Sequence, residues 1–150
     1  NTSIFCDAKN SDSVNNLNIN LKKRDHYQPL APILLEEDFK KYFNINKNIE
    51  KNLKWMGTLC NANEELYKEY SSIIHIDGTC RAQVITNKDC LTYKILRKLK
   101  DKGSKILVNT SFNISKDPVV FDLFDVFVNM KRLDIKYVLM DDGLYQSKSL

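Results

Sequence analysis

Runs of apolar residues, some alternating with polar residues and some continuous, predict short β-strands along most of the chain. The predicted strands or extended segments are residues 3–8, 28–35, 54–60, 72–77, 80–86, 105–108, 135–140 and 143–148. The run at 105–108 is almost entirely apolar, which is typical of a strand covered on both faces. The last two strands meet at Asp141-Asp142-Gly143, a turn sequence that favours a β-hairpin.

Apolar residues at helical spacing predict helices between these strands. The predicted helices are residues 13–20, 36–43, 89–102 and 122–131, with a loop at 44–52 and a helical turn or connection at 61–71. In the last helix we expect Phe124, Phe127 and Val128 to be buried and Asn129 to be exposed. Strands that alternate with helices and end in a hairpin predict one α/β or α+β domain with a mixed, twisted sheet flanked by helices.

Composition narrows the class of protein. The chain has 150 residues, of which 43% are hydrophobic and 28% charged, as in an ordinary globular domain. Its net charge of +4 is mild, so we expect no nucleic-acid partner, and no apolar run is long enough to cross a membrane. Four cysteines show no metal-ligand spacing with His26 or His75, which predicts no metal site and reduced thiols in a cytoplasmic protein.

Two clusters of polar side chains each follow an apolar run. The first cluster follows Asp77-Gly78 and includes Thr79 and Arg81, and the second is Asn109-Thr110-Ser111-Phe112-Asn113. Strand ends are where open α/β sheets place their ligands. If the clusters converge, the arginine and the amide and hydroxyl donors favour an anionic, phosphate-bearing ligand. The alternatives are a salt bridge from Arg81 to Asp77 and a simple turn that ends the second strand.

Two further pairs of residues are candidates for chemistry. Lys22 and Arg24 precede a segment stiffened by Pro29 and Pro32, and they predict either a phosphate clamp or a solvated loop end.

His75 and Asp77, two apart at a strand end, would project to the same side. They would then form an acid/base pair or contribute to a metal site. The alternative is a structural, hydrogen-bonded histidine.

Three sequence strings resemble a known family. They are Leu21-Lys22-Lys23-Arg24-Asp25, the stretch from His75 to Gln83 that reads HIDGTCRAQ, and the stretch from Leu107 to Asn113 that reads LVNTSFN. Together with Pro29-Leu30-Ala31-Pro32 they are similar to the C-terminal domain of the NodU/CmcH-type O-carbamoyltransferases. The resemblance covers almost the whole chain.

The resemblance implies a YrdC-like fold and a domain that makes carbamoyl-adenylate from carbamoyl phosphate and ATP, with Mg²⁺. It assigns catalytic positions to Lys22, Arg81 and Ser111. It assigns substrate and nucleotide binding to Arg24, His75, Asp77, Thr79, Asn109 and Asn113. Residues 1–150 would then be a fragment of a larger enzyme. In that enzyme, an N-terminal actin-like domain holds iron and transfers the carbamoyl group to a hydroxyl of a sugar or secondary metabolite.

The chain departs from the family pattern at several positions. Thr2 and Gln28 stand where the family usually has Arg, and Cys80 replaces an Ala. The loop before Pro118 lacks the customary Gly-Glu. Because two cations are lost, a non-catalytic nucleotide-binding or docking module, which positions the acceptor for the N-terminal domain, is the alternative function.

Overall fold

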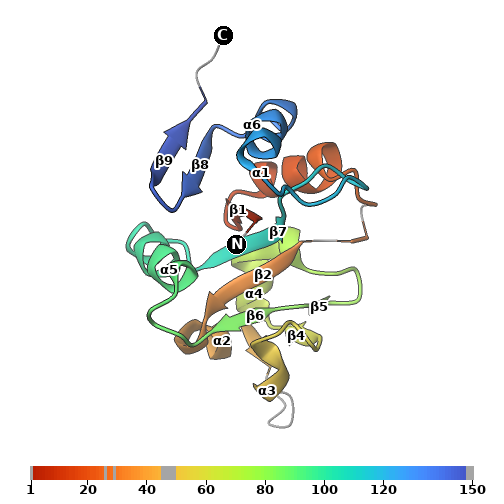
Figure 1. The fold of residues 1–150 in the computed structure, drawn as a ribbon. Coiled ribbons are helices and arrows are strands. Elements are labelled where there is room, and N and C mark those ends of the chain that lie inside the picture. Colours follow the sequence, from red (N-terminus) through yellow and green to blue (C-terminus); the bar gives the residue numbers. More distant parts are fainter. Residues whose placement is uncertain (1, 26, 29, 45–49, 148–150) are drawn as a thin grey trace.

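The computed structural model describes residues 2–25, 27–28, 30–44 and 50–147. Two residues named in the sequence analysis lie outside the described residues: His26, considered as a metal ligand, and Pro29, predicted to stiffen the chain. Most of the predicted loop at 44–52 lies outside them as well. A four-stranded sheet has the order β1-β7-β2-β6 (Figure 1). Its strands are β1 (Ser3–Asp7), β7 (Ile106–Ser111), β2 (Ala31–Leu35) and β6 (Gln83–Ile85). Strand β7 is antiparallel to both neighbours and β2 is parallel to β6, so the sheet is mixed.

Helices cover both faces of this sheet. They are α1 (Ser11–Asn15), the π-helix η1 (Asn16–Leu21), α2 (Glu36–Tyr42), α3 (Glu50–Leu53), α4 (Glu64–Tyr70), the 3-10 helix η2 (Ser71–Ile73), α5 (Leu91–Asp101) and α6 (Leu123–Arg132). Ile106 and Val108 pack with α1, α2 and α4, whereas Leu107 packs with Leu96 of α5. The prediction that this strand is covered on both faces is therefore confirmed. So is the predicted fold class, one domain with a mixed sheet flanked by helices.

Two smaller sheets complete the fold. Strands β3 (Phe43–Asn44), β4 (Cys60–Ala62) and β5 (Thr79–Cys80) form a three-stranded antiparallel sheet. Strands β8 (Tyr137–Met140) and β9 (Gly143–Gln146) form the predicted hairpin, a separate two-stranded sheet beside α6 (Figure 1). A third apolar cluster, which includes Phe112, Met130 and Val138, joins α6 and this hairpin to the end of β7.

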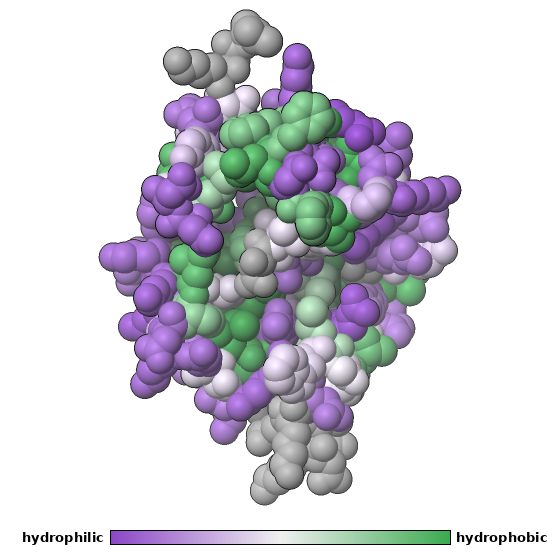
Figure 2. Space-filling model, viewed as in Figure 1, coloured by the Kyte–Doolittle hydropathy of each residue, from purple (hydrophilic) through white to green (hydrophobic). Residues whose placement is uncertain are grey.

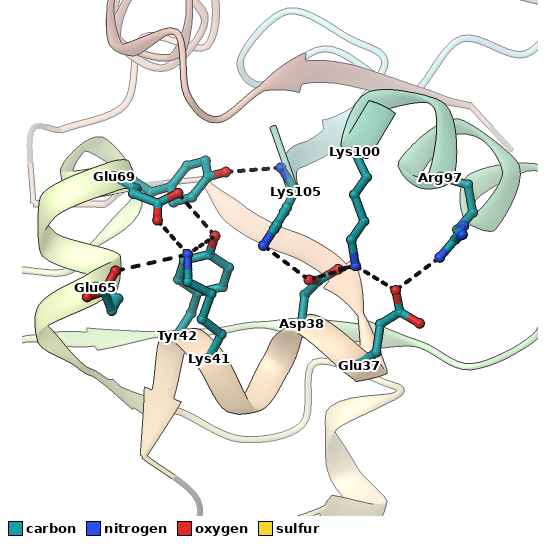
Figure 3. A network of polar contacts seen from close by, with 10 residues as sticks. Glu37, Asp38, Lys41, Tyr42, Glu65, Glu69, Arg97, Lys100 and Lys105 are labelled. Atoms are coloured by element: carbon teal, nitrogen blue, oxygen red, sulfur yellow. Dashed lines mark hydrogen bonds and ion pairs between the residues drawn. The ribbon is translucent and has the colours of Figure 1, made fainter. Parts of the chain in front are cut away.

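Ion pairs link α2 to α4, to α5 and to Lys105 (Figure 3). The buried carboxylate of Asp38 lies 2.9 Å from Lys100 Nζ of α5 and 3.7 Å from Lys105 Nζ. Lys41 Nζ donates to Glu69 Oε1 of α4 at 2.6 Å, and the buried Tyr42 hydroxyl donates to Glu69 Oε2 at 3.1 Å.

Two predicted strands are wrong. Residues 54–56 form a turn after α3, in which Met56 has a φ of +54°, and the strand of this region is Cys60–Ala62 instead.

Residues 72–77 form the end of η2 and a tight turn, closed by hydrogen bonds from His75 N to Thr79 O and from Gly78 N to His75 O. Gly78 has a φ of +80°, which a residue without Cβ adopts easily, and this turn overrides the strand preference of the β-branched run.

The predicted orientation of α6 is also wrong. Phe124 and Phe127 are 75% and 50% exposed, Val128 is exposed, and Asn129 is buried. Apolar residues surround much of this helix, so its periodicity does not single out one inward face. Packing of Met130 against Phe112 selects the face opposite the one that we predicted.

The described part of the chain contains no helix that is long and apolar enough to span a bilayer.

Candidate functional site

A pocket of about 360 Å³ lies beside the second half of β7. Its described lining residues are Thr2, Ser3, Arg24, Ala31, Met56, Arg81, Asn109, Thr110, Ser111 and Val119. The structure thus brings Arg81, from the segment before β6, to the same cavity as the polar residues of β7. Strand β2 separates β6 from β7, so Arg81 and the polar residues of β7 meet across an intervening strand. The predicted convergence of the two clusters is thus found for Arg81, Asn109 and Ser111.

Arg24 and Arg81 give the pocket two fixed positive charges. Burial, and then the Arg81 guanidinium, lowers the pKa of Arg24. None of the described lining residues is acidic, and neither arginine makes an ion pair with a described residue. The alternative salt bridge from Arg81 to Asp77 is therefore not formed. An anion in this pocket would relieve the repulsion between two like charges.

Lys22 has a different environment from the two arginines. Its side chain is buried, and its Nζ donates to the Ser111 and Asn113 carbonyls at 3.0 and 2.8 Å and to Asn113 Oδ1 at 2.6 Å. Ser111 Oγ lies 3.3 Å from the same Nζ and donates to Asn113 Oδ1 at 2.7 Å. Burial, and then Arg24, lowers the pKa of the Lys22 ammonium. Lys22 therefore holds the end of β7 in place through neutral oxygens.

The segment that carries Lys22 and Arg24 is neither extended nor a fully solvated loop end. Lys22 ends η1, and Lys23 follows with a φ of +48°. A hydrogen bond from Arg24 N to Asn18 O, at 3.1 Å, fixes the backbone at this residue. Its Nη2 donates to Thr110 Oγ1 at 3.2 Å, so the guanidinium is oriented along β7.

Asn109 occupies the middle of the sheet beside the pocket. Its backbone is paired with Phe5 of β1 on one side and Ala31 of β2 on the other. Its side-chain Oδ1 is buried and has no hydrogen-bond partner among the described residues. Buried polar atoms are normally paired, so this amide is a contact point available to a ligand.

The structure does not bring His75, Asp77 and Thr79 to the pocket. His75 Nδ1 lies 3.1 Å from Thr79 Oγ1. Asp77 Oδ1 accepts hydrogen bonds from the Thr79 hydroxyl and amide at 2.7 and 3.0 Å, which lower the pKa of Asp77. The predicted same-side projection from a strand end is wrong because these residues form a turn. Their interactions satisfy one another and fix the chain that leads to Arg81.

Metal coordination has no basis in the described residues, which contain no group of three or more His, Cys, Asp or Glu side chains able to hold an ion. Three further lining residues, Met56, Thr110 and Val119, were not among the predicted site residues. Thr110 belongs to the polar string that drew attention to this strand. Met56 and Val119 carried no signal in the sequence, because loops bring them to the pocket.

A solved structure shares this fold. The crystal structure of full-length HypF in the phosphate- and nucleotide-bound form matches 87% of this chain, with a TM-score of 0.63 and 21% sequence identity. The matched region is 17% of the HypF chain.

Curated relatives match along almost the entire chain. Nodulation protein NolO of Bradyrhizobium diazoefficiens is 31% identical over 150 residues, which are 99% of this chain and 27% of NolO. The 3'-hydroxymethylcephem-O-carbamoyltransferase of Streptomyces clavuligerus is 26% identical over 148 residues, 97% of this chain and 27% of that enzyme. The chain thus spans about a quarter of the length of these relatives.

The family described as Carbamoyltransferase C-terminus matches residues 1–147. This match includes every residue of the pocket and of the Lys22 contacts. The chain therefore belongs to the carbamoyltransferase C-terminal family.

Proposed function

We propose that this domain binds ATP and carbamoyl phosphate in the pocket at β7 and forms carbamoyl-adenylate within a larger O-carbamoyltransferase. The observation that carries the proposal is the pair Arg24 and Arg81, which face a cavity with no described acidic residue. Both substrates are polyanions, and fixed guanidinium groups are suited to phosphate oxygens. Residues 1–150 would be the C-terminal part of the enzyme.

In the proposed reaction, water first cleaves carbamoyl phosphate to carbamate and phosphate. A carbamate oxygen then attacks the α-phosphorus of ATP, which forms carbamoyl-adenylate and breaks the bond to the leaving pyrophosphate. Negative charge builds on the phosphate oxygens, and Arg24 and Arg81 would stabilise it without reorganisation. Asn109 and Ser111 supply an amide and a hydroxyl, which would hold the carbamoyl group or the ribose. Lys22 would position Ser111 and Asn113 and not contact substrate, since its ammonium already has four oxygen neighbours.

Mg²⁺ would be held mainly by the phosphates of ATP and by water, because no described lining residue is a carboxylate. The iron that the resemblance implies would belong to the N-terminal domain, together with the acceptor alcohol.

The comparisons support these substrates. The Streptomyces clavuligerus relative is named as an O-carbamoyltransferase, and HypF was solved with phosphate and nucleotide bound. A soluble cytoplasmic enzyme without nucleic-acid or membrane partners fits the mild charge and the substrates.

The second candidate is a nucleotide-binding or docking module without adenylation activity. It is favoured by Thr2, which lines the pocket at a position where the family usually has Arg. The loss of one cation beside Arg24 and Arg81 would weaken the stabilisation of the leaving pyrophosphate.

An exchange assay decides between the two. The chain is incubated with ATP, Mg²⁺ and labelled pyrophosphate, with or without carbamoyl phosphate. We expect label to enter ATP only with carbamoyl phosphate, to be lost in Arg81→Ala, and to be retained in Arg97→Ala, which removes the same charge from α5. ATP binding without exchange would establish the docking module, and no binding of either substrate would refute both.

A further inference from the structure

An exposed apolar surface covers one end of the molecule. The residues of this surface, here called the α6 surface, are Phe121, Leu123, Phe124, Phe127, Leu139 and Leu144. Phe121 is 94% exposed and Phe124 is 75% exposed. Figure 2 shows apolar side chains gathered over α6, above a hollow in the face of the molecule. Large contiguous apolar patches are rare on isolated soluble domains and mark contact sites.

A groove of about 660 Å³ continues this surface into the domain. Side chains from β1, α5, α6 and the β8–β9 hairpin line it, including Phe121, Leu139 and Leu144 of the α6 surface. Within the described residues, the hairpin has two strands and pairs with neither of the other sheets. A two-stranded hairpin depends on packing against other elements for its stability, and here its inner side packs against α6 through the cluster around Met130. The surface and the groove are thus one site, shaped to receive apolar side chains.

We propose that the α6 surface and its groove bind the N-terminal part of the same polypeptide. This inference rests on the proposed function, in which the chain is one part of a larger enzyme. The family is defined as the C-terminus of carbamoyltransferases, and the chain spans only 27% of NolO and 27% of the Streptomyces clavuligerus enzyme. About three-quarters of such a polypeptide lies outside the described domain, enough for a covering domain.

The position of the groove favours this occupant. Thr2 and Ser3 line both the groove and the anion-binding pocket, so the two cavities adjoin at the start of β1. A domain that acts on the product of the pocket would need to lie beside it, and the α6 surface is an adjoining apolar face. The exposure of α6 agrees, because large aromatic side chains on a helix normally pack inward, whereas Phe124 and Phe127 here lie in water.

Hydrogen exchange tests the proposal in the full-length polypeptide that contains this chain. In that polypeptide we expect the amides of residues 121–128 to exchange about tenfold or more slowly than in this chain alone, because a covered helix opens less often. The double substitution Phe124→Ser and Phe127→Ser should restore the faster exchange. Leu59→Ser, which also alters a half-exposed apolar residue but far from α6 in the fold, should not.

Three results would overturn the proposal. They are equal exchange at 121–128 in the two proteins, protection in this chain alone that grows with its concentration, and a coding sequence that contains no further domain. Protection that grows with concentration would assign the surface to a second copy. ATP and carbamoyl phosphate binding is measured on the same proteins. Failure of wild-type binding would refute the proposed function alone, whereas unprotected α6 in a protein that binds both ligands would refute the docking alone.

Discussion

The three cations near the end of β7 differ in what holds them. Lys22 is buried against neutral oxygens, Arg24 is oriented by Thr110, and Arg81 is exposed and makes no ion pair with a described residue. The positive charge therefore has a structural role at Lys22 and, in the proposed function, a ligand-binding role at the two arginines. Lys22 maintains the loop, and the two arginines are available to an anion.

Arg81→Ala should weaken binding of ATP or carbamoyl phosphate without lowering the melting temperature. The loss of a charge-assisted phosphate contact removes about 1.5–3 kcal/mol, which is roughly a 10- to 150-fold loss of affinity. Calorimetric titration measures the affinity, and Arg97→Ala is the matched control. A collapse of stability with unchanged affinity would show that Arg81 is a structural residue.

Thr2→Arg should tighten binding of ATP, because Thr2 lines the pocket. The gain should shrink at high salt, since exposed charges are screened. Gln28→Arg should have a smaller effect, because Gln28 is not among the described lining residues and its carbonyl accepts from Asn18 Nδ2 at 3.1 Å. Titrations at low and high salt compare the variants. Equal affinities for wild type and Thr2→Arg would show that this position does not reach the ligand.

At the scale of elements, ion pairs connect α2 to two other helices. Its acidic first turn pairs with Arg97 and Lys100 of α5, and Lys41 in its last turn pairs with Glu69 of α4 (Figure 3). These contacts tie α2 to α4, which packs in the same large core cluster, and to α5, which packs on the other face of the sheet. The stability of this arrangement depends on ionised carboxylates.

Glu69→Gln should destabilise the protein at neutral pH but not in acid. The hydrogen bond from Lys41 holds the pKa of Glu69 below its ordinary value near 4.5. A lowered folded-state pKa contributes stability above the ordinary value, and this contribution is lost as the pH falls through the folded-state pKa. Because the pair is partly exposed, we expect a loss of about 0.5 kcal/mol at pH 7.

Urea unfolding of wild type and Glu69→Gln at pH 7 and at successively lower pH measures this difference. Asp89→Asn, which removes an exposed carboxylate that makes no ion pair with a described residue, is the control. A difference that stays constant into acid would mean that the effect is not ionic.

At the scale of the whole molecule, stability is unevenly distributed. The central strands β7 and β2 lie between two packed faces, whereas the β8–β9 hairpin is attached through a separate cluster around Phe112 and Met130. The end that carries α6 and the hairpin is thus held by an apolar cluster of its own. It is also the end that exposes the α6 surface.

In this chain alone, amides of β8 and β9 should exchange much faster than those of β7, because a two-stranded sheet opens without disturbing the core. Hydrogen exchange followed by NMR or mass spectrometry measures both regions in one experiment. Equal protection in the hairpin and in β7 would mean that the hairpin and the main sheet unfold as one unit.

Local sequence patterns correctly predicted the elements with a clear apolar run, a clear helical periodicity or a clear turn sequence. The apolar run at 105–108, the amphipathic pattern of residues 91–101 and the Asp-Asp-Gly turn all became the expected strand, helix and hairpin. The run at 72–77 failed because hydrogen bonds between His75, Thr79 and Gly78 form a turn, which a β-branched composition does not reveal.

Short strings of residue types were enough to predict the mixed α/β fold class, the family and the polar residues of the two clusters. Which of those residues meet depends on how distant segments pack, and this could not be read from such strings. The tertiary structure placed Arg81 beside Arg24 and Asn109, turned His75 and Asp77 away from the pocket, and enclosed Lys22 among carbonyl and amide oxygens. The buried face of α6 also depends on the tertiary structure. Several sides of this helix are apolar, so packing against Phe112, and not helical periodicity, sets its orientation.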